Sequence, residues 1–154
     1  VYIRLFRRQA ENVFDDDYEF DLGKADLLRD GSDVTLIASG VCVANALQAA
    51  ETLAQEGVSA RVLNIHTIKP IDADAVIKAA SETGALVTAE NHNVIGGLGS
   101  AVAEVLAEQR PTPLERVGVK DHFGQVGKAP YLMGVFGITA ADIAKAARKA
   151  IARK

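Results

Sequence analysis

The chain has 154 residues, the length of one ordinary domain, and at this length about 68–70% of the unfolded chain's surface is buried on folding. Hydrophobic residues make up 49% of the chain and charged residues 24%, which excludes a disordered or fibrous protein. The formal net charge of -3 argues against nucleic acid or an anionic membrane as a partner, because both require a concentrated basic surface.

The chain contains a single cysteine, Cys42, which cannot form an internal disulfide. It lies in the apolar start of an expected helix, so we interpret it as a buried, unreactive thiol of a cytoplasmic protein. No apolar run approaches the roughly 18 residues of a membrane-spanning helix, and no signal peptide opens the sequence. The sequence begins at Val1, inside a strand-like segment, so we expect it to be part of a longer polypeptide.

Short apolar runs alternate with helical patterns along the chain. Apolar residues between positions 41 and 55 recur at the spacing of one helix face, and Gly57 is a typical helix stop. Thr139 and Asp142 form a capping-box pattern that predicts the start of the last helix. In chain order we expect a strand VYIRLF, an acidic loop over 15–21, an edge strand over 23–29, a strand over 34–38, a helix over 41–55, a strand over 60–65, a helix between Asp72 and Gly84, a strand over 85–89, a helix over 98–109, a strand over 114–119, a short helix over 131–136 and a last helix from 139 to the end.

Repeated strand–helix–strand units with mostly apolar strands predict an α/β fold, in which helices cover both faces of a parallel sheet. Right-handed crossovers place all strand-to-helix turns at one edge of such a sheet. Polar residues that follow the strands should gather there, and all three histidines are among them. We call this set the strand-end rim: Ser39, His66, Glu90, Asn91, His92, Asp121 and His122.

The histidines of the rim, together with Glu90 and Asp121, are of the types that bind metals or transfer protons. They show no metal-ligand spacing such as HExxH, and polar residues are common in the strand-end loops of any α/β protein. We therefore interpret them as ordinary rim residues.

A glycine-rich turn containing Gly96, Gly97 and Gly99 joins an apolar strand to the following helix. Backbone N–H groups at such a turn can hold a phosphate, with support from the helix dipole. The turn lacks the third glycine of GxGxxG, and no acidic residue stands at the right distance to bind a ribose. We favour a close-packed turn over a nucleotide site, and the sequence has neither a P-loop nor a GxSxG motif.

Arg4, Arg7 and Arg8 form a small cationic cluster near the start of the chain. Guanidinium groups bind phosphate in a bidentate manner, whereas arginines at alternate strand positions are also typical of a solvated edge. Both interpretations stay open from spacing alone.

Several segments, in order, resemble the C-terminal domain of transketolases. They are VYIRL at the start, GSDVTLIASG at 31–40, ARVLNIHTIKPID at 60–72, VTAENHNVIGGLGSAVAEVL at 87–106, DHFGQVG at 121–127 and FGITAADI at 136–143. The chain is most similar to split transketolases, in which a separate C-terminal subunit carries a pyrimidine-binding domain followed by this domain. The same domain type occurs in 1-deoxyxylulose-5-phosphate synthase and in the β subunit of 2-oxo-acid dehydrogenases.

The resemblance implies a three-layer α/β/α fold whose five-stranded sheet is mostly parallel, with one antiparallel strand. Residues 1–14 would end the preceding pyrimidine-binding domain or form a linker strand, and residues 15–154 would form the C-terminal domain. The implied activity is two-carbon ketol transfer between sugar phosphates, as in the pentose phosphate pathway. The implied partners are an N-terminal diphosphate-binding subunit, the pyrimidine-binding domain and a second copy in a homodimer.

The resemblance also implies that thiamine diphosphate and Mg²⁺ bind outside this chain. In the family, a GDG motif and a glutamate of the two other domains hold the cofactor, and this chain has neither, so the isolated chain is expected to be inactive. A family arginine that binds the substrate phosphate corresponds to Arg7 or Arg8. Glu90, Asn91, His92 and the glycine-rich turn match the family motif and are expected to pack at an interface, with no catalytic role.

Two other hypotheses share the fold. The chain would be a non-enzymatic interaction domain, which predicts an apolar face left exposed. Alternatively, it would be a free-standing binder of a small molecule at the strand-end rim, in the manner of flavodoxin-like proteins.

Overall fold

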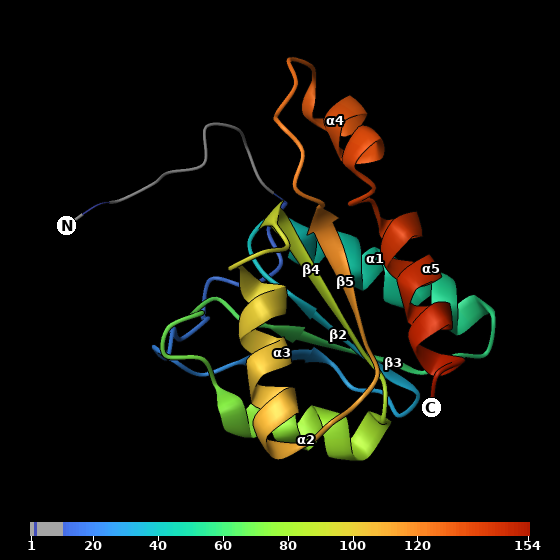
Figure 1. Ribbon diagram of the computed structural model, residues 1–154. Coiled ribbons are helices and arrows are strands. Elements are labelled where there is room, and N and C mark those ends of the chain that lie inside the picture. The colour runs from blue at the N-terminus through green and yellow to red at the C-terminus, as the bar shows by residue number, and fades with distance from the viewer. Residues whose placement is uncertain (1, 3–10) are drawn as a thin grey trace.

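The computed structural model describes Tyr2 and residues 11–154, so Arg7, Arg8 and all of the expected strand VYIRLF except Tyr2 lie outside the described residues. A five-stranded sheet forms the middle of the molecule, with the strand order β1-β3-β2-β4-β5 (Figure 1). β1 pairs antiparallel with β3, and every other pair is parallel, which confirms the predicted sheet. The strands are β1 (Asp26–Arg29), β2 (Val34–Ala38), β3 (Ala60–Asn64), β4 (Leu86–Asn93) and β5 (Leu114–Val119).

Among the described residues, four helices cover the two faces of the sheet, and a fifth projects beyond it (Figure 1). α1 and α5 pack on one face, and α2 and α3 pack on the other. The three-layer α/β/α prediction is therefore confirmed. The helices are α1 (Cys42–Gln55), α2 (Ala73–Thr83), α3 (Leu98–Gln109), α4 (Ala129–Phe136) and α5 (Ala140–Ile151).

The sheet separates two apolar cores built mainly from aliphatic side chains. Leu36 and Val87 face the core beneath α1 and α5, whereas Ile37 and Leu86 face the core beneath α2 and α3. All five residues of β2 are buried, as expected for a central strand with helices on both sides. Burial on both faces explains why β2 is apolar at every position except Thr35 and does not alternate between apolar and polar residues.

The helix boundaries follow from local capping chemistry. The Asp72 side chain accepts a hydrogen bond from the Ala75 N–H at 3.1 Å at the start of α2, and Gly84 ends this helix in the left-handed conformation. Thr139 and Asp142 form the predicted capping box at the start of α5, which confirms that motif.

The expected end of β4 at residue 89 is wrong, because the strand continues through Asn93. Asn93 pairs with Val119, and the Val94 N–H donates to the Val119 carbonyl at 2.9 Å. The register shifts between Ala89 and Asn93, so the strand resumes its pairing with β5 after an irregularity. Glu90, Asn91 and His92 are therefore strand residues rather than residues of a loop.

The start of α4 and the end of α5 differ from the sequence prediction by two residues or more. α4 begins at Ala129, two residues early, because Pro130 is well tolerated in the first turn of a helix. α5 ends at Ile151 and does not reach the last residue. Within residues 11–154 no helix combines the length and the apolar character needed to cross a membrane.

Candidate functional site

The carboxyl ends of the four parallel strands lie at one edge of the sheet, and the rim residues are distributed along this edge. They do not converge into one constellation. Asp121 has a left-handed backbone (φ 53°) and accepts a hydrogen bond from Asn93 at 3.2 Å, whereas His92 Nδ1 lies 2.9 Å from the Asn93 carbonyl oxygen. In the described part of the chain, no three His, Cys, Asp or Glu side chains gather closely enough to hold a metal ion.

Glu90 is the one rim carboxylate that is fully buried, with 2% of its surface exposed. Its Oε2 accepts a hydrogen bond from the Leu98 N–H and its Oε1 accepts one from the Gly99 N–H, both at 2.8 Å. A carboxylate at this position satisfies two free N–H groups at the start of α3 and complements the helix dipole. The N–H groups that would hold a phosphate are therefore occupied by the protein's own side chain.

The glycines of this turn allow the close approach that Glu90 needs. A Cβ at Gly97 would lie 1.9 Å from Glu90 Oε2, and a Cβ at Gly99 would lie 2.8 Å from Thr88 Oγ1. Gly96 has a left-handed backbone with φ +76°, which favours glycine for a separate reason. The turn is packed tightly against the end of β4.

His66 lies in a second polar cluster, at the end of β3. Its Nδ1 is 2.8 Å from Thr67 Oγ1, and its Nε2 is 3.9 Å from Asp26 Oδ2. The imidazole ring packs against the Phe20 ring, with 4.4 Å between the two ring centroids. Asp26 also accepts a hydrogen bond from the Asn64 amide at 2.8 Å. Sequence analysis missed Asp26, because its position on the antiparallel edge strand becomes evident only once β1 pairs with β3.

Cys42 is completely buried at the start of α1. Burial and the nearby negative charge of Glu90 raise the pKa of this thiol to about 11. At pH 8 only about one in a thousand such thiols is ionised. We therefore expect native protein to react with a thiol reagent such as Ellman's reagent at least ~100-fold more slowly than protein unfolded in urea. Equal rates in the two states would contradict this assignment.

The chain between β5 and α5 forms an exposed arm, which we call the α4 arm and define as residues 121–136. It projects from the same edge of the sheet as the carboxyl ends of β4 and β5 (Figure 1). No residue of α4 is buried. The large exposed hydrophobic side chains of the arm are Phe123 (98%), Val126 (103%), Tyr131 (62%) and Val135 (44%). Apolar side chains gathered on one exposed segment mark an interaction surface, and sequence analysis had not singled this one out.

Residues 23–143 match the family model described as "Transketolase, C-terminal domain", and the chain belongs to this family. It is 57% identical, over all 154 residues, to a 6-deoxy-6-sulfo-D-fructose transketolase subunit from a Clostridium species (strain MSTE9), and covers 48% of that relative. It is 41% identical over 138 residues to a 1-deoxy-D-xylulose-5-phosphate synthase from Geobacter sulfurreducens, covering 88% of this chain and 22% of that relative.

A solved structure described as a split gene transketolase, inactive beta4 tetramer, superposes with a TM-score of 0.92 and 46% identity. The match covers 95% of this chain and 48% of that one. The chain therefore spans about half the length of the split-transketolase relatives that it matches.

Thiamine diphosphate is the cofactor that the family implies, and the glycine-rich turn does not fit it. At such a turn a diphosphate would be held by free N–H groups or by a metal bound to carboxylates. At the glycine-rich start of α3, the N–H groups of Leu98 and Gly99 already donate hydrogen bonds to Glu90. Residues 11–154 also contain no cluster of acidic side chains that could hold a metal. No catalytic step is therefore assigned to these residues.

Proposed function

We propose that this chain is the C-terminal domain of a thiamine diphosphate-dependent transketolase that is assembled from separate subunits. The observation that carries this proposal is the 57% identity, over the full length of the chain, to a subunit of such an enzyme. The cofactor supplies the carbanion chemistry of ketol transfer. The diphosphate and Mg²⁺ are bound by an N-terminal subunit and by a preceding pyrimidine-binding domain.

The role of this domain in the proposed enzyme is packing and assembly in the cytoplasm. Residues 1–14 end the preceding pyrimidine-binding domain or link it to this one, and residues 15–154 form the packing unit. The α4 arm supports this role, because its apolar side chains stand uncovered at the strand-end edge. Two copies associate around the assembled site, as a homodimer of the catalytic unit.

Within the proposed enzyme, Arg7 or Arg8 binds the phosphate of the sugar substrate. Arginine suits this task because its guanidinium group makes two parallel hydrogen bonds to a phosphate. Replacing the correct arginine with alanine would raise the KM for a phosphorylated donor, whereas replacing the other one would leave it unchanged.

The test is reconstitution of the complete enzyme. The subunit containing this chain and its preceding domain is combined with the N-terminal subunit, thiamine diphosphate and Mg²⁺. Ketol transfer to ribose 5-phosphate is then measured with xylulose 5-phosphate and with 6-deoxy-6-sulfo-D-fructose as donors. We expect activity that requires both subunits and the cofactor, and activity without thiamine diphosphate would disprove the proposal.

The similarity to 1-deoxy-D-xylulose-5-phosphate synthase supports a second candidate reaction. The two reactions differ in product, because the second forms 1-deoxy-D-xylulose 5-phosphate. The same reconstituted enzyme therefore distinguishes the two candidates, since formation of that product without ketol transfer would favour the second.

A further inference from the structure

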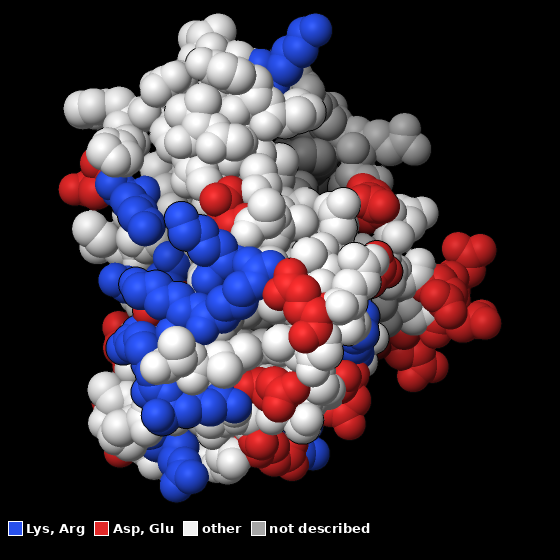
Figure 2. Space-filling view, turned by 90° about the vertical axis from the view of Figure 1, so that its right-hand side faces the viewer, with Lys and Arg blue, Asp and Glu red and all other residues white. Residues whose placement is uncertain are grey.

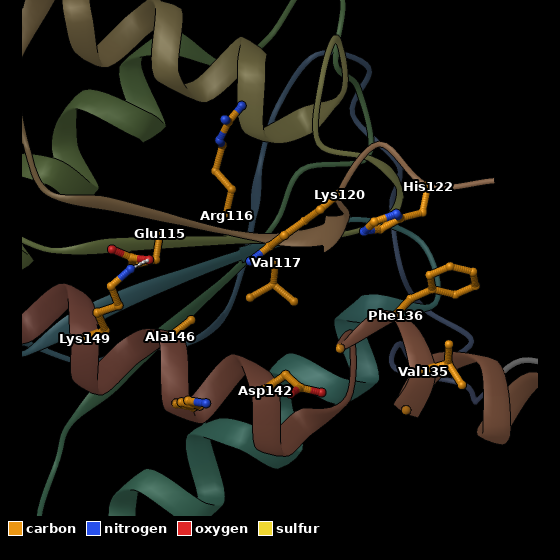
Figure 3. Close-up of a pocket in the computed structure, with 13 residues that line it drawn as sticks. Glu115, Arg116, Val117, Lys120, His122, Val135, Phe136, Asp142, Ala146 and Lys149 are labelled. Atoms are coloured by element: carbon orange, nitrogen blue, oxygen red, sulfur yellow. Dashed lines mark hydrogen bonds and ion pairs between the residues drawn. The ribbon is translucent and has the colours of Figure 1, made fainter. Parts of the chain in front are cut away.

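A groove runs between β5, the edge strand of the sheet, and α5, with the end of α4 closing one side of it (Figure 3). We call it the β5–α5 groove, and its volume is about 450 Å³. Arg116 projects away from the groove toward α3 and donates to the Val94 carbonyl at 3.0 Å (Figure 3). The side chains that matter for binding are Val117, Lys120, His122, Phe136, Lys145 and Lys149.

Both carboxylates that line the groove are already engaged by other groups. Glu115 lies 2.9 Å from Lys149 Nζ and also pairs with Arg153. Burial opposes ionisation of Glu115, but the hydrogen bonds from these two cations outweigh it and lower the pKa of the carboxyl group. Asp142 Oδ2 accepts hydrogen bonds from the Thr139 N–H and hydroxyl group as part of the α5 capping box.

Lys120 and Lys145 are left without an acidic partner among the residues that the structure describes. They differ in this from Arg61, Arg148 and Arg153, each of which forms an ion pair. Lys and Arg side chains gather in a band on the face that carries α5 (Figure 2). The groove therefore has uncompensated positive charge in a protein whose net charge is -3.

The groove combines these cations with an apolar floor. Val117 is only 6% exposed, and the Lys120 side chain extends over it (Figure 3). Phe136 lies at the end of the groove away from Glu115 and Lys149 (Figure 3). Small-molecule sites have volumes of about 300–1,000 Å³ and combine apolar walls with a few polar groups. Lysine ammonium groups bind phosphate as point charges.

We propose that the β5–α5 groove binds a small organic phosphate, with Lys120 and Lys145 on the phosphate groups and Val117 and Phe136 against its apolar part. This proposal does not rest on the proposed ketol transfer, because it uses only groove residues between Val117 and Lys149. Phe123, Val126 and Tyr131 do not line the groove, so ligand binding and docking of the α4 arm involve largely different residues.

The test measures binding to the 154-residue chain by titration calorimetry, with adenosine 5′-diphosphate, inorganic pyrophosphate and adenosine as probes. We expect adenosine 5′-diphosphate to bind more tightly than pyrophosphate, because only the nucleotide has a part that can contact Val117 and Phe136. We expect no binding of adenosine, because it has no phosphate group. The double variant Lys120→Gln/Lys145→Gln should weaken nucleotide binding at least ~10-fold, since it removes both ammonium groups from the phosphate contacts. Amide resonances of Val117 and Phe136 should shift on binding.

The matched control is Lys24→Gln/Lys78→Gln, which removes the same charge from exposed lysines outside the groove. We expect this control to retain nucleotide affinity within ~2-fold. Absence of saturable binding, or equal losses in the two double variants, would overturn the proposal. Tighter binding of an acidic peptide matching residues 15–21 than of the nucleotide would also overturn it, because the groove would then be a protein-docking site.

Discussion

Gly97→Ala is expected to lower the free energy of unfolding by about 3 kcal/mol. The added methyl group would lie 1.9 Å from Glu90 Oε2 and 2.9 Å from the Asn93 carbonyl oxygen, so the Glu90 carboxylate has to move. When it moves, the hydrogen bonds from the Leu98 and Gly99 N–H groups lengthen or break. Urea denaturation followed by circular dichroism measures the loss.

Gly134→Ala is the matched control, because no atom lies within 4 Å of a Cβ at this exposed helical position. We expect this variant to be unchanged or more stable by up to ~1 kcal/mol, from the higher helix propensity of alanine. A double-mutant cycle with Glu90→Ala tests the cause. In that background, the cost of Gly97→Ala should fall by at least ~1 kcal/mol, since the colliding carboxylate is gone. Strictly additive costs would disprove the proposed contact between these two residues.

Local patterns in the sequence predicted the elements of this fold well. The apolar run of β2, the capping box of Thr139 and Asp142 and the helix periodicity of α1 each depend on residues close together in the chain. Interactions between distant residues were not predictable in this way. β4 continues to Asn93 only because Val119 of β5 offers it a partner, and no pattern within β4 itself indicates this.

The candidate site likewise combines features that the sequence predicts with features that only the folded chain creates. Sequence reasoning placed Glu90 at the strand-end edge, but its bonds to two N–H groups at the start of α3 require the three-dimensional turn. Lys120 and Lys145 are 25 residues apart in the sequence and share a groove only because α5 packs beside β5. Their lack of ion-pair partners is likewise a property of the folded state.

The second large effect concerns assembly. Phe123→Ser/Val126→Ser is expected to weaken association with the remaining parts of the proposed enzyme by at least ~100-fold. Both side chains are almost fully exposed in the α4 arm, so they contribute no burial to the stability of the isolated domain. Burial of a phenylalanine and a valine at an interface is worth about 1.5–3 kcal/mol each. Sedimentation velocity of the subunit mixed with its companion measures the association.

The same variant should unfold within about 2 °C of the parent chain, because neither side chain contributes to a core. Leu27→Ser is the control, since Leu27 is a similar apolar side chain, 58% exposed, on the opposite edge strand β1. It should leave association unchanged. If Phe123→Ser/Val126→Ser associates with the companion subunit as tightly as the parent does, the α4 arm is not the docking surface. If the variant instead converts an oligomer of this subunit alone to monomers, the arm contacts a second copy of the subunit rather than the companion.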